Sequence, residues 1–368
     1  MLNADAAFLE RLQVIHMQDP WRAVSSFNIQ HSTFRAPYHA AELPPLTHTL
    51  MTNHTPAALR RFTKFNAFAT LFLIFAGAMV TSTGSGLAVP DWPLSYGMLF
   101  PPMVGGIFYE HGHRMIAATV GFLTVIQAIW LQFREPKRFL RRLGWISLLA
   151  VVIQGLLGGL TVIYLLPLPI SVGHAALAEV FFCLNVSIAF FASRTYGRLV
   201  DAKESRNANG PELVFRTRML AGLVFLQVLA GAVMRHLGAG LAIPDFPLSF
   251  GRLIPEMTSV GIAVNYTHRV GALLIVIATI SLWSRVFRMV QVRPVKAMYV
   301  TLLMILTIQI LLGAFTVWSG KNPVITSVHV AIGATTLAIT LLLALATRSS
   351  ASDSEAQRVR ALQREVAA

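Results

Sequence analysis

The sequence predicts an all-α integral membrane protein whose eight transmembrane helices form two tandem four-helix bundles. Composition, long apolar runs and an internal repeat predict this fold. Hydrophobic residues make up 55% of the 368 residues and charged residues 12%, with a mean hydropathy of +0.62, whereas soluble domains carry about 25% charged residues. Because the charges lie between the apolar runs, the pattern is typical of a polytopic membrane protein.

Eight apolar runs are long enough to cross a membrane. A transmembrane helix needs about 20 mostly apolar residues, and backbone that faces lipid must satisfy its hydrogen bonds within a helix or a closed barrel. The runs cover about 63–83, 108–132, 143–165, 171–193, 214–234, 263–288, 296–319 and 325–347. We therefore expect a helix over each run.

Polar segments delimit the predicted domains. We expect an N-terminal tail over 1–62, a first four-helix repeat over 63–193, a linker over 194–213, a second repeat over 214–347 and a C-terminal tail over 348–368. No apolar region follows a basic start, so we expect no signal peptide, and Asp5, Glu10 and Asp19 argue against a mitochondrial transit peptide.

Basic residues predict the orientation. Of the 30 Lys and Arg residues, 25 fall in the two tails and the segments after the second, fourth and sixth runs, and only three fall in the segments on the other side. Because Lys and Arg collect in cytoplasmic loops, we predict a multi-pass protein of the cell (inner) membrane, with both termini cytoplasmic and loops 84–107 and 235–262 outside. The same clustering explains the net charge of +14, so we expect no nucleic-acid partner.

The two halves repeat the same motifs in the same order. The segment Gly84–Gly97, GSGLAVPDWPLSYG, matches GAGLAIPDFPLSFG at an offset of 154. At an offset of 155, three further matches follow: His113-Arg114 with His268-Arg269, Gln154–Gly158 with Gln309–Gly313, and His174 with His329. Each repeat contains an even number of spans, so the halves share one orientation and are predicted to be related by a pseudo-two-fold axis along the membrane normal.

Each half carries a pair of histidines 61 residues apart, His113 with His174 and His268 with His329. All four lie three to five residues inside the outward end of their runs and so reach a similar depth. Neutral imidazole is a good iron ligand, and two of them fit haem ligation from both sides. A single such histidine is more often a hydrogen-bonded core residue or a proton relay, but four at matched positions favour the haem site.

Arg114 and Arg269 directly follow two of these histidines. A helical step of about 100° turns their side chains away from the iron. There a guanidinium can bind a haem propionate, because its fork matches a carboxylate; the alternative is an arginine that extends to the outer membrane interface.

The repeat differs at one residue that bears on chemistry. Glu110 lies three residues before His113, on the same helix face, while Asn265 occupies this place before His268. A carboxylate near a haem edge can move protons or stabilise developing positive charge, and an amide cannot ionise. One half therefore looks reactive and the other looks like a cofactor holder, unless Glu110 is an interfacial acid that faces water.

Other residues of the outward segments are weaker candidates. Helical phase places His111 away from His113, at the membrane interface, and His236 has Ser82 at its repeat position. Trp92 and Phe246 can cover a porphyrin or form part of an interfacial aromatic belt.

Residues 63–347 resemble the haem A synthase family, membrane enzymes that convert haem O into haem A for terminal oxidases. The doubled loop motif, Glu110-x-x-His113-Arg114, Asn265-x-x-His268-Arg269, His174 and His329 carry the resemblance. It implies that His268 and His329 hold a haem b cofactor; Arg114 and Arg269, through the propionate contact considered above, are further candidate cofactor-binding residues. It also implies that His113 and His174 bind the iron of the haem O substrate and that Glu110 is catalytic.

The chain departs from the family in two places. Many members carry a cysteine pair in the outward loops, the later one where Ser95 or Ser249 stands here, whereas the single cysteine of this chain is Cys183. Any thiol role is therefore absent or met by other groups. The 60-residue N-terminal tail is also outside the family pattern.

The resemblance implies an oxidoreductase that oxidises the C8 methyl of haem O to a formyl group by two hydroxylations. No G-x-G-x-x-G nucleotide motif is present, so we expect an external electron partner. We also expect haem O synthase as the donor of substrate, contact with membrane lipid, and room for a homo-oligomer. The alternatives are a di-haem b electron-transfer cytochrome, which would not need Glu110 in one half only, and a duplicated transporter, which would hold no haem.

Overall fold

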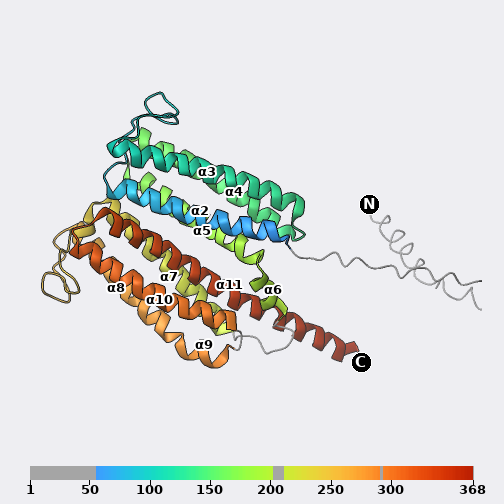
Figure 1. Cartoon of the computed structure of the whole chain (residues 1–368). Coiled ribbons are helices and arrows are strands. Elements are labelled where there is room, and N and C mark those ends of the chain that lie inside the picture. The colour runs from blue at the N-terminus through green and yellow to red at the C-terminus, as the bar shows by residue number, and fades with distance from the viewer. Residues whose placement is uncertain (1–54, 202–210, 291–292, 368) are drawn as a thin grey trace, which may run out of the picture. The chain divides into compact units, whose positions relative to one another are not determined.

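The computed structural model describes residues 55–201, 211–290 and 293–367, and this part of the chain is helical (Figure 1). Most of the predicted N-terminal tail, and residues 202–210 of the predicted linker, lie outside these residues. Within them, the only strand-like contacts are two isolated bridges, Ser95 with Met98 and Ser249 with Arg252.

Eight helices are long and apolar enough to cross a membrane, as predicted. In the first half they are α2 (Ala57–Ser82), α3 (Gly105–Arg134), α4 (Arg138–Ile163) and α5 (Leu168–Phe191). In the second half they are α7 (Pro211–His236), α8 (Val260–Ser281), α10 (Arg293–Trp318) and α11 (Pro323–Ala367). Two short helices, α6 (Arg194–Asp201) and α9 (Trp283–Met289), and the 3-10 turn η1 (Ala239–Leu241) complete the described elements.

Helix packing forms a four-helix bundle from each half. In the first, α2 packs against α3 and α5, and α4 packs against the same two helices. In the second, α7 packs against α8 and α11, and α10 contacts the same two helices. The halves meet where α2 and α5 pack against α11 and α5 packs against α7. The two-fold relation between the halves remains a prediction.

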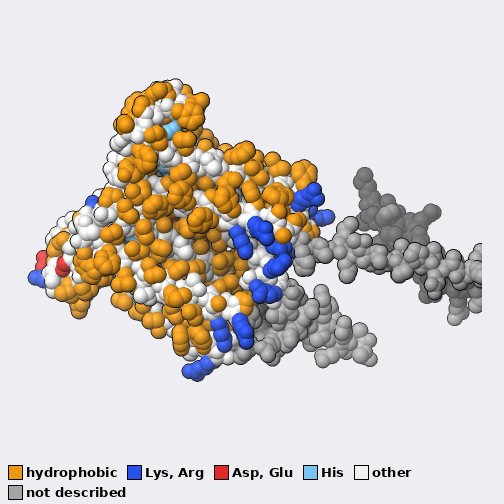
Figure 2. All heavy atoms as spheres, in the orientation of Figure 1, with side chains coloured by type: hydrophobic (Ala, Val, Ile, Leu, Met, Phe, Trp, Pro, Cys, Tyr) orange, Lys and Arg blue, Asp and Glu red, His pale blue; other side chains and the backbone are white. Residues whose placement is uncertain are grey.

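The bundles have two distinct ends. Segments 83–104 and 237–259 leave the same end in Figure 1, which we call the loop side, and α6 and α9 lie at the opposite end, the tail side. Lys and Arg side chains gather at the tail side of the face in Figure 2, and hydrophobic side chains cover the surface between the ends. This arrangement suits a protein that crosses a membrane.

The two bundle cores differ in polarity on their tail sides. In the first bundle, the amide of fully buried Asn185 accepts hydrogen bonds from Gln127 (2.8 Å) and Ser147 (3.2 Å). At an offset of 155, leucines Leu282 and Leu302 replace Gln127 and Ser147, and both are fully buried in an apolar cluster. At these positions hydrogen bonds between helices therefore support the first bundle and apolar packing supports the second, although the Tyr299 hydroxyl of the second bundle also donates to the carbonyl oxygen of Thr279 (2.7 Å).

The predicted orientation leads to a labelling experiment. We expect Leu99→Cys and Leu253→Cys, introduced after Cys183→Ser, to react with an impermeant thiol reagent added to intact cells. These two leucines are equivalent in the repeat and are 71% and 82% exposed in the loop-side segments. An exposed tail-side control, Arg142→Cys, should react only after permeabilisation. If Arg142→Cys reacted in intact cells, and Leu99→Cys and Leu253→Cys reacted only after permeabilisation, the predicted orientation would be wrong.

Candidate functional site

Each of the four predicted histidine ligands packs its ring against a glycine on the neighbouring helix. A Cβ atom placed on that glycine would lie about 3 Å from the histidine Cε1, tighter than most van der Waals contacts. The pairs are His113 with Gly77 (2.9 Å), His174 with Gly158 (3.1 Å), His268 with Gly231 (3.0 Å) and His329 with Gly313 (3.2 Å). A larger residue would force the ring to shift, most clearly at Gly77, so glycine at these four positions leaves room for the rings.

Glutamine side chains one turn from two of these glycines fix the backbone beside a histidine. Gln154 donates from Nε2 to the carbonyl oxygen of His174 (3.0 Å), and Gln227 donates to that of His268 (2.7 Å). Gln227 Nε2 also lies 3.1 Å from His268 Nδ1. Partners of this kind set the orientation of a ligand ring. The repeat position of Gln227 in the first half is Leu73, so His113 lacks this neighbour.

The two histidines of each half come from opposite helices of one bundle, a placement that suits a haem iron. His113 lies on α3 and His174 on α5, which both pack against α2 and α4, and His268 on α8 and His329 on α11 are placed in the same way between α7 and α10. The Nδ1 atoms of His113, His174 and His329 are buried and have no hydrogen-bond partner in the described residues, which is costly unless a ligand or metal compensates. No group of three or more His, Cys, Asp or Glu side chains in these residues could hold a bare metal ion. Two imidazoles alone fit haem ligation better.

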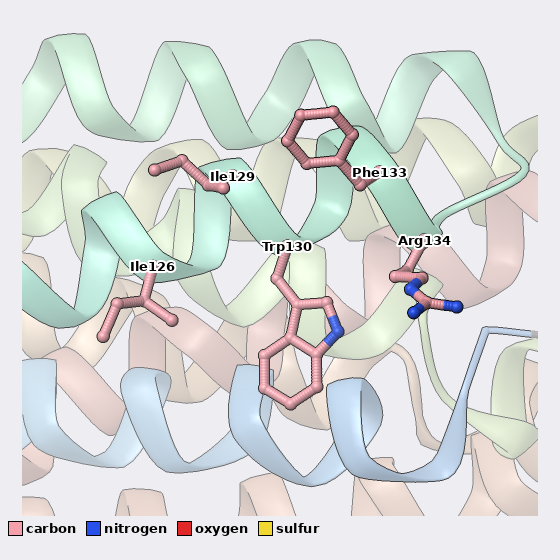
Figure 3. A pocket seen from close by; sticks show the side chains of 5 residues that line it. All are labelled: Ile126, Ile129, Trp130, Phe133 and Arg134. Carbon is pink, nitrogen blue, oxygen red and sulfur yellow. The ribbon is translucent and has the colours of Figure 1, made fainter.

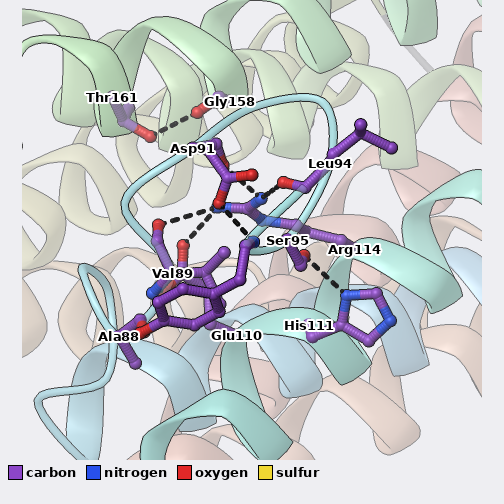
Figure 4. A network of polar contacts seen from close by, with 11 residues as sticks. Ala88, Val89, Asp91, Leu94, Ser95, Glu110, His111, Arg114, Gly158 and Thr161 are labelled. Atoms are coloured by element: carbon purple, nitrogen blue, oxygen red, sulfur yellow. Dashed lines mark hydrogen bonds and ion pairs between the residues drawn. The ribbon is translucent and has the colours of Figure 1, made fainter. Parts of the chain in front are cut away.

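In the first half, Arg114 joins the loop-side segment to α3 (Figure 4). Its Nη1 donates to the carbonyl oxygens of Asp91 (2.7 Å) and Leu94 (2.9 Å). Its Nη2 donates to the carbonyl oxygen of Val89 (3.2 Å) and to Glu110 Oε1 (2.6 Å). Glu110 is 4% exposed, and its Oε2 accepts the backbone N–H of Val89 (2.8 Å). The carboxylate is therefore buried and held at both oxygens, and does not face water.

In the second half, Arg269 has the same role and a neutral partner. It donates to the carbonyl oxygens of Asp245 (2.7 Å), Leu248 (2.9 Å) and Ile243 (2.9 Å). Its Nε donates to Asn265 Oδ1 (2.9 Å). An amide can thus replace the carboxylate as a partner of the arginine and still leave the loop in place.

These contacts limit the number of N–H donors that Arg114 and Arg269 have left for a haem propionate. A guanidinium has five N–H donors, and four are engaged in both Arg114 and Arg269. At most one donor of each is left for a haem carboxylate. Their predicted propionate contact stays a prediction, and loop anchoring accounts for most of their hydrogen bonds.

Aspartates hold the turn in each loop. Asp91 accepts the backbone N–H groups of Tyr96 (2.6 Å) and Gly97 (2.8 Å), and Asp245 accepts the equivalent groups of the second loop. Tyr96 has a φ of 53°, the left-handed conformation that few side chains adopt freely. The hydrogen bonds from Gly97 and Tyr96 lower the pKa of Asp91, so the carboxylate remains charged and holds the turn at neutral pH.

The side chain of His111 differs from expectation, and the two alternatives for Trp92 stay open. His111 is 6% exposed, and its Nδ1 lies 2.8 Å from Ser95 Oγ, so the predicted place at the membrane interface is wrong: the loop folds back over the helix and covers the ring. Trp92 packs its ring on Gly159 of α4.

Figure 3 shows a pocket on the tail-side part of α3, lined by Ile126, Ile129, Trp130, Phe133 and Arg134. It contains no histidine and is separate from the site.

The sequence pattern indicated the histidines as candidate haem ligands, but it did not indicate the glycines against which their rings pack. A signal was present, because Gln-x-x-x-Gly occurs at 154–158, 227–231 and 309–313. Spacing alone does not show that a glycine touches a histidine on another helix.

This contact predicts a haem-binding defect in Gly231→Ala. The new methyl group would displace the His268 ring, so we expect the purified protein to lose or shift the spectrum of the low-spin haem that His268 is predicted to bind. Gly222→Ala is a control on the same helix, because a Cβ there meets no atom within 4 Å. An unchanged spectrum in Gly231→Ala would show that the ring is not confined by the glycine.

Comparison with known proteins identifies the family. Residues 104–343, more than half of the chain, match the model of the cytochrome oxidase assembly protein family. A haem A synthase of Symbiobacterium thermophilum is 32% identical over 64% of this chain and 77% of its own length. The haem A synthase of Shouchella clausii is 30% identical over 67% of this chain and 83% of its own length. That of Listeria monocytogenes is 27% identical over 78% of this chain and 94% of its own length. The chain therefore belongs to the haem A synthase family.

Proposed function

We propose that this chain converts haem O into haem A. The reaction oxidises the C8 methyl of the porphyrin by two successive hydroxylations, and the resulting geminal diol loses water to leave a formyl group. The observation that carries the proposal is a pair of similar histidine sites, of which one alone has a buried carboxylate, in a chain that belongs to the haem A synthase family. Two sites with similar histidine pairs, only one of which has a carboxylate, suit a protein whose cofactor and substrate are both haems.

The residues divide between these two roles. In the second half, His268 and His329 would hold a haem b cofactor, which supplies one-electron transfer when bound. In the first half, His113 and His174 would bind the substrate iron and so fix the porphyrin. Glu110 lies one turn from His113 on α3 and would exchange a proton with the reacting group. Arg114 holds Glu110 and the loop together and so positions this carboxylate.

The surroundings complete the proposal. We place the protein in the cell (inner) membrane with both termini cytoplasmic, in contact with lipid. Haem O synthase would supply the substrate, and an external carrier would exchange the electrons. A homo-oligomer is compatible with the exposed apolar helix faces.

The alternative is a di-haem b cytochrome, which the matched histidine pairs also suit. Such a protein would not need Glu110 in one half only.

Expression in a host that makes haem O but has no haem A synthase tests the proposal. Extracted pigments should then contain haem A, and a His113→Ala variant expressed at the same level should leave haem O unconverted. Extracts that contain haem O alone, from cells in which the wild-type chain is present in the membrane, would contradict the proposed function.

A further inference from the structure

Arg235 lies where the two bundles meet on the loop side. It is the second-last residue of α7, and its Nη2 donates to the carbonyl oxygen of Ala78 and to Ser82 Oγ (2.7 Å), both on α2. The side chain is half-buried and bonds to a neighbouring helix. It therefore does not extend to the membrane interface, as a basic residue at the end of a span ordinarily does.

The charge of Arg235 has no acidic partner in the described residues. The ion pairs there join Arg114 to Glu110, Arg252 to Glu256, and Arg216 and Arg285 to Glu212. The Nη1 and Nε donors of Arg235 make no hydrogen bond with the described residues, which leaves three of its five N–H groups unengaged. A partly desolvated cation without a counter-charge is unfavourable, so this position suits an anionic ligand.

The position of Arg235 points to the haem of the second half. Arg235 follows Gly231 by one helical turn, and Gly231 is the residue against which His268 packs. Ser82, which accepts from Arg235, also accepts a hydrogen bond from Ser327 Oγ (3.1 Å), two residues before His329 on α11. Arg235 thus lies beside the helix positions of both predicted ligands of one iron, one turn nearer the loop side than Gly231. A haem carries two propionate carboxylates, and a guanidinium binds a carboxylate through paired hydrogen bonds.

The repeat lacks this charge in the other half. At an offset of 154, Thr81 replaces Arg235, and its hydroxyl donates to the carbonyl oxygen of Gly77 (3.3 Å). A cofactor benefits from an ionic anchor, whereas a substrate must leave as product. The second half therefore has a cation at this position and the first half does not. This is the difference expected if the haem of the second half is retained and the haem of the first half is released.

We propose that Arg235 binds a propionate of the haem held by His268 and His329 and so retains that haem as a cofactor. This inference rests on the proposed function, which supplies the haem. It assigns the propionate contact to an arginine with three unengaged donors, in contrast to Arg114 and Arg269, which have one each.

The rate of haem loss from the purified full-length protein tests the proposal. Wild type and Arg235→Gln are mixed with excess apomyoglobin, and transfer of the low-spin haem is followed by absorbance. We expect Arg235→Gln to lose haem about 10- to 100-fold faster, the factor that one charge-assisted hydrogen bond typically contributes. Haem loss at the wild-type rate would overturn the proposal.

Two controls separate the propionate contact from other effects. Ser82→Ala removes a contact between α7 and α2 and keeps the cation, and Arg252→Gln removes an exposed loop-side charge that is paired with Glu256. Both should lose haem within about twofold of the wild-type rate, since neither touches the proposed carboxylate contact. If Ser82→Ala released haem as fast as Arg235→Gln, Arg235 would act by holding the helices together, and the proposal would be wrong.

If Arg235→Gln does not fold, the rate of haem loss from Arg235→Lys tests the propionate contact instead. Lysine keeps the charge but not the paired hydrogen bonds, so we expect roughly threefold to tenfold faster loss, and wild-type retention would again overturn the proposal. A wild-type protein that purifies without any low-spin haem would contradict the proposed function together with this inference. A haem-bearing wild type with an unaffected Arg235→Gln would contradict this inference alone.

Discussion

Purified His268→Ala and His329→Ala proteins are expected to lack the low-spin haem that the wild type retains. If these histidines hold the cofactor as proposed, each substitution would remove one of its two imidazole ligands, and a single imidazole would not maintain a low-spin haem. The absorbance spectrum of the reduced protein and the ratio of haem to protein measure this loss. An unchanged low-spin spectrum in either variant would exclude that histidine as a ligand of the cofactor.

His113→Ala and His174→Ala are the matched controls in the other half. They should leave the retained haem in place and abolish haem A formation, because they would remove the proposed ligands of the substrate iron. The four histidines pack against glycines in the same way, so a general effect on folding should appear equally in both sets. Loss of the retained haem from the first-half variants would contradict the division of roles.

Glu110→Gln is expected to reduce haem A formation by about 10²- to 10⁴-fold, the range that proton transfer by a positioned side chain typically contributes. Folding and haem content should stay near the wild-type level. Asn265 supports this expectation, because it holds Arg269 and the second loop with a neutral amide. The measurement is the proportion of haem O, hydroxylated intermediate and haem A in cell extracts.

The converse change serves as the control. Asn265→Glu should not create a second reactive site if, as proposed, the porphyrin of the second half is a cofactor. Wild-type haem A formation by Glu110→Gln would remove the catalytic role and leave the carboxylate as an anchor of Arg114 and the first loop.

The sequence predicted the spanning helices well and their ends less well. Each of the eight apolar runs is a helix, because few other structures satisfy the backbone in lipid. The first run was expected to begin at 63, whereas α2 begins at Ala57 and continues through the basic residues Arg60 and Arg61. Charged residues at the tail side can stay helical beyond the apolar core of a membrane, so hydropathy underestimates helix length.

The sequence suggested candidate site residues, but it did not reveal most of their contacts. Repeat-matched positions singled out the four histidines as candidates, and the difference between Glu110 and Asn265 was visible in the sequence. The loop contacts of Arg114 and the burial of His111 depend on how segment 83–104 folds back onto α3, which spacing along one helix does not reveal. The contact of Arg235 with Ala78 joins residues 157 positions apart, and no local pattern predicts it.

The identity of the haems bound by the purified wild-type protein tests the division of roles most directly. Protein from a host that makes haem O should release two kinds of pigment on extraction: haem b, which disappears in His268→Ala, and haem O or its oxidation products, which disappear in His113→Ala. The account predicts this split between the two halves. Haem b in both halves, with neither haem O nor haem A in the extract, would contradict it and identify a di-haem electron carrier.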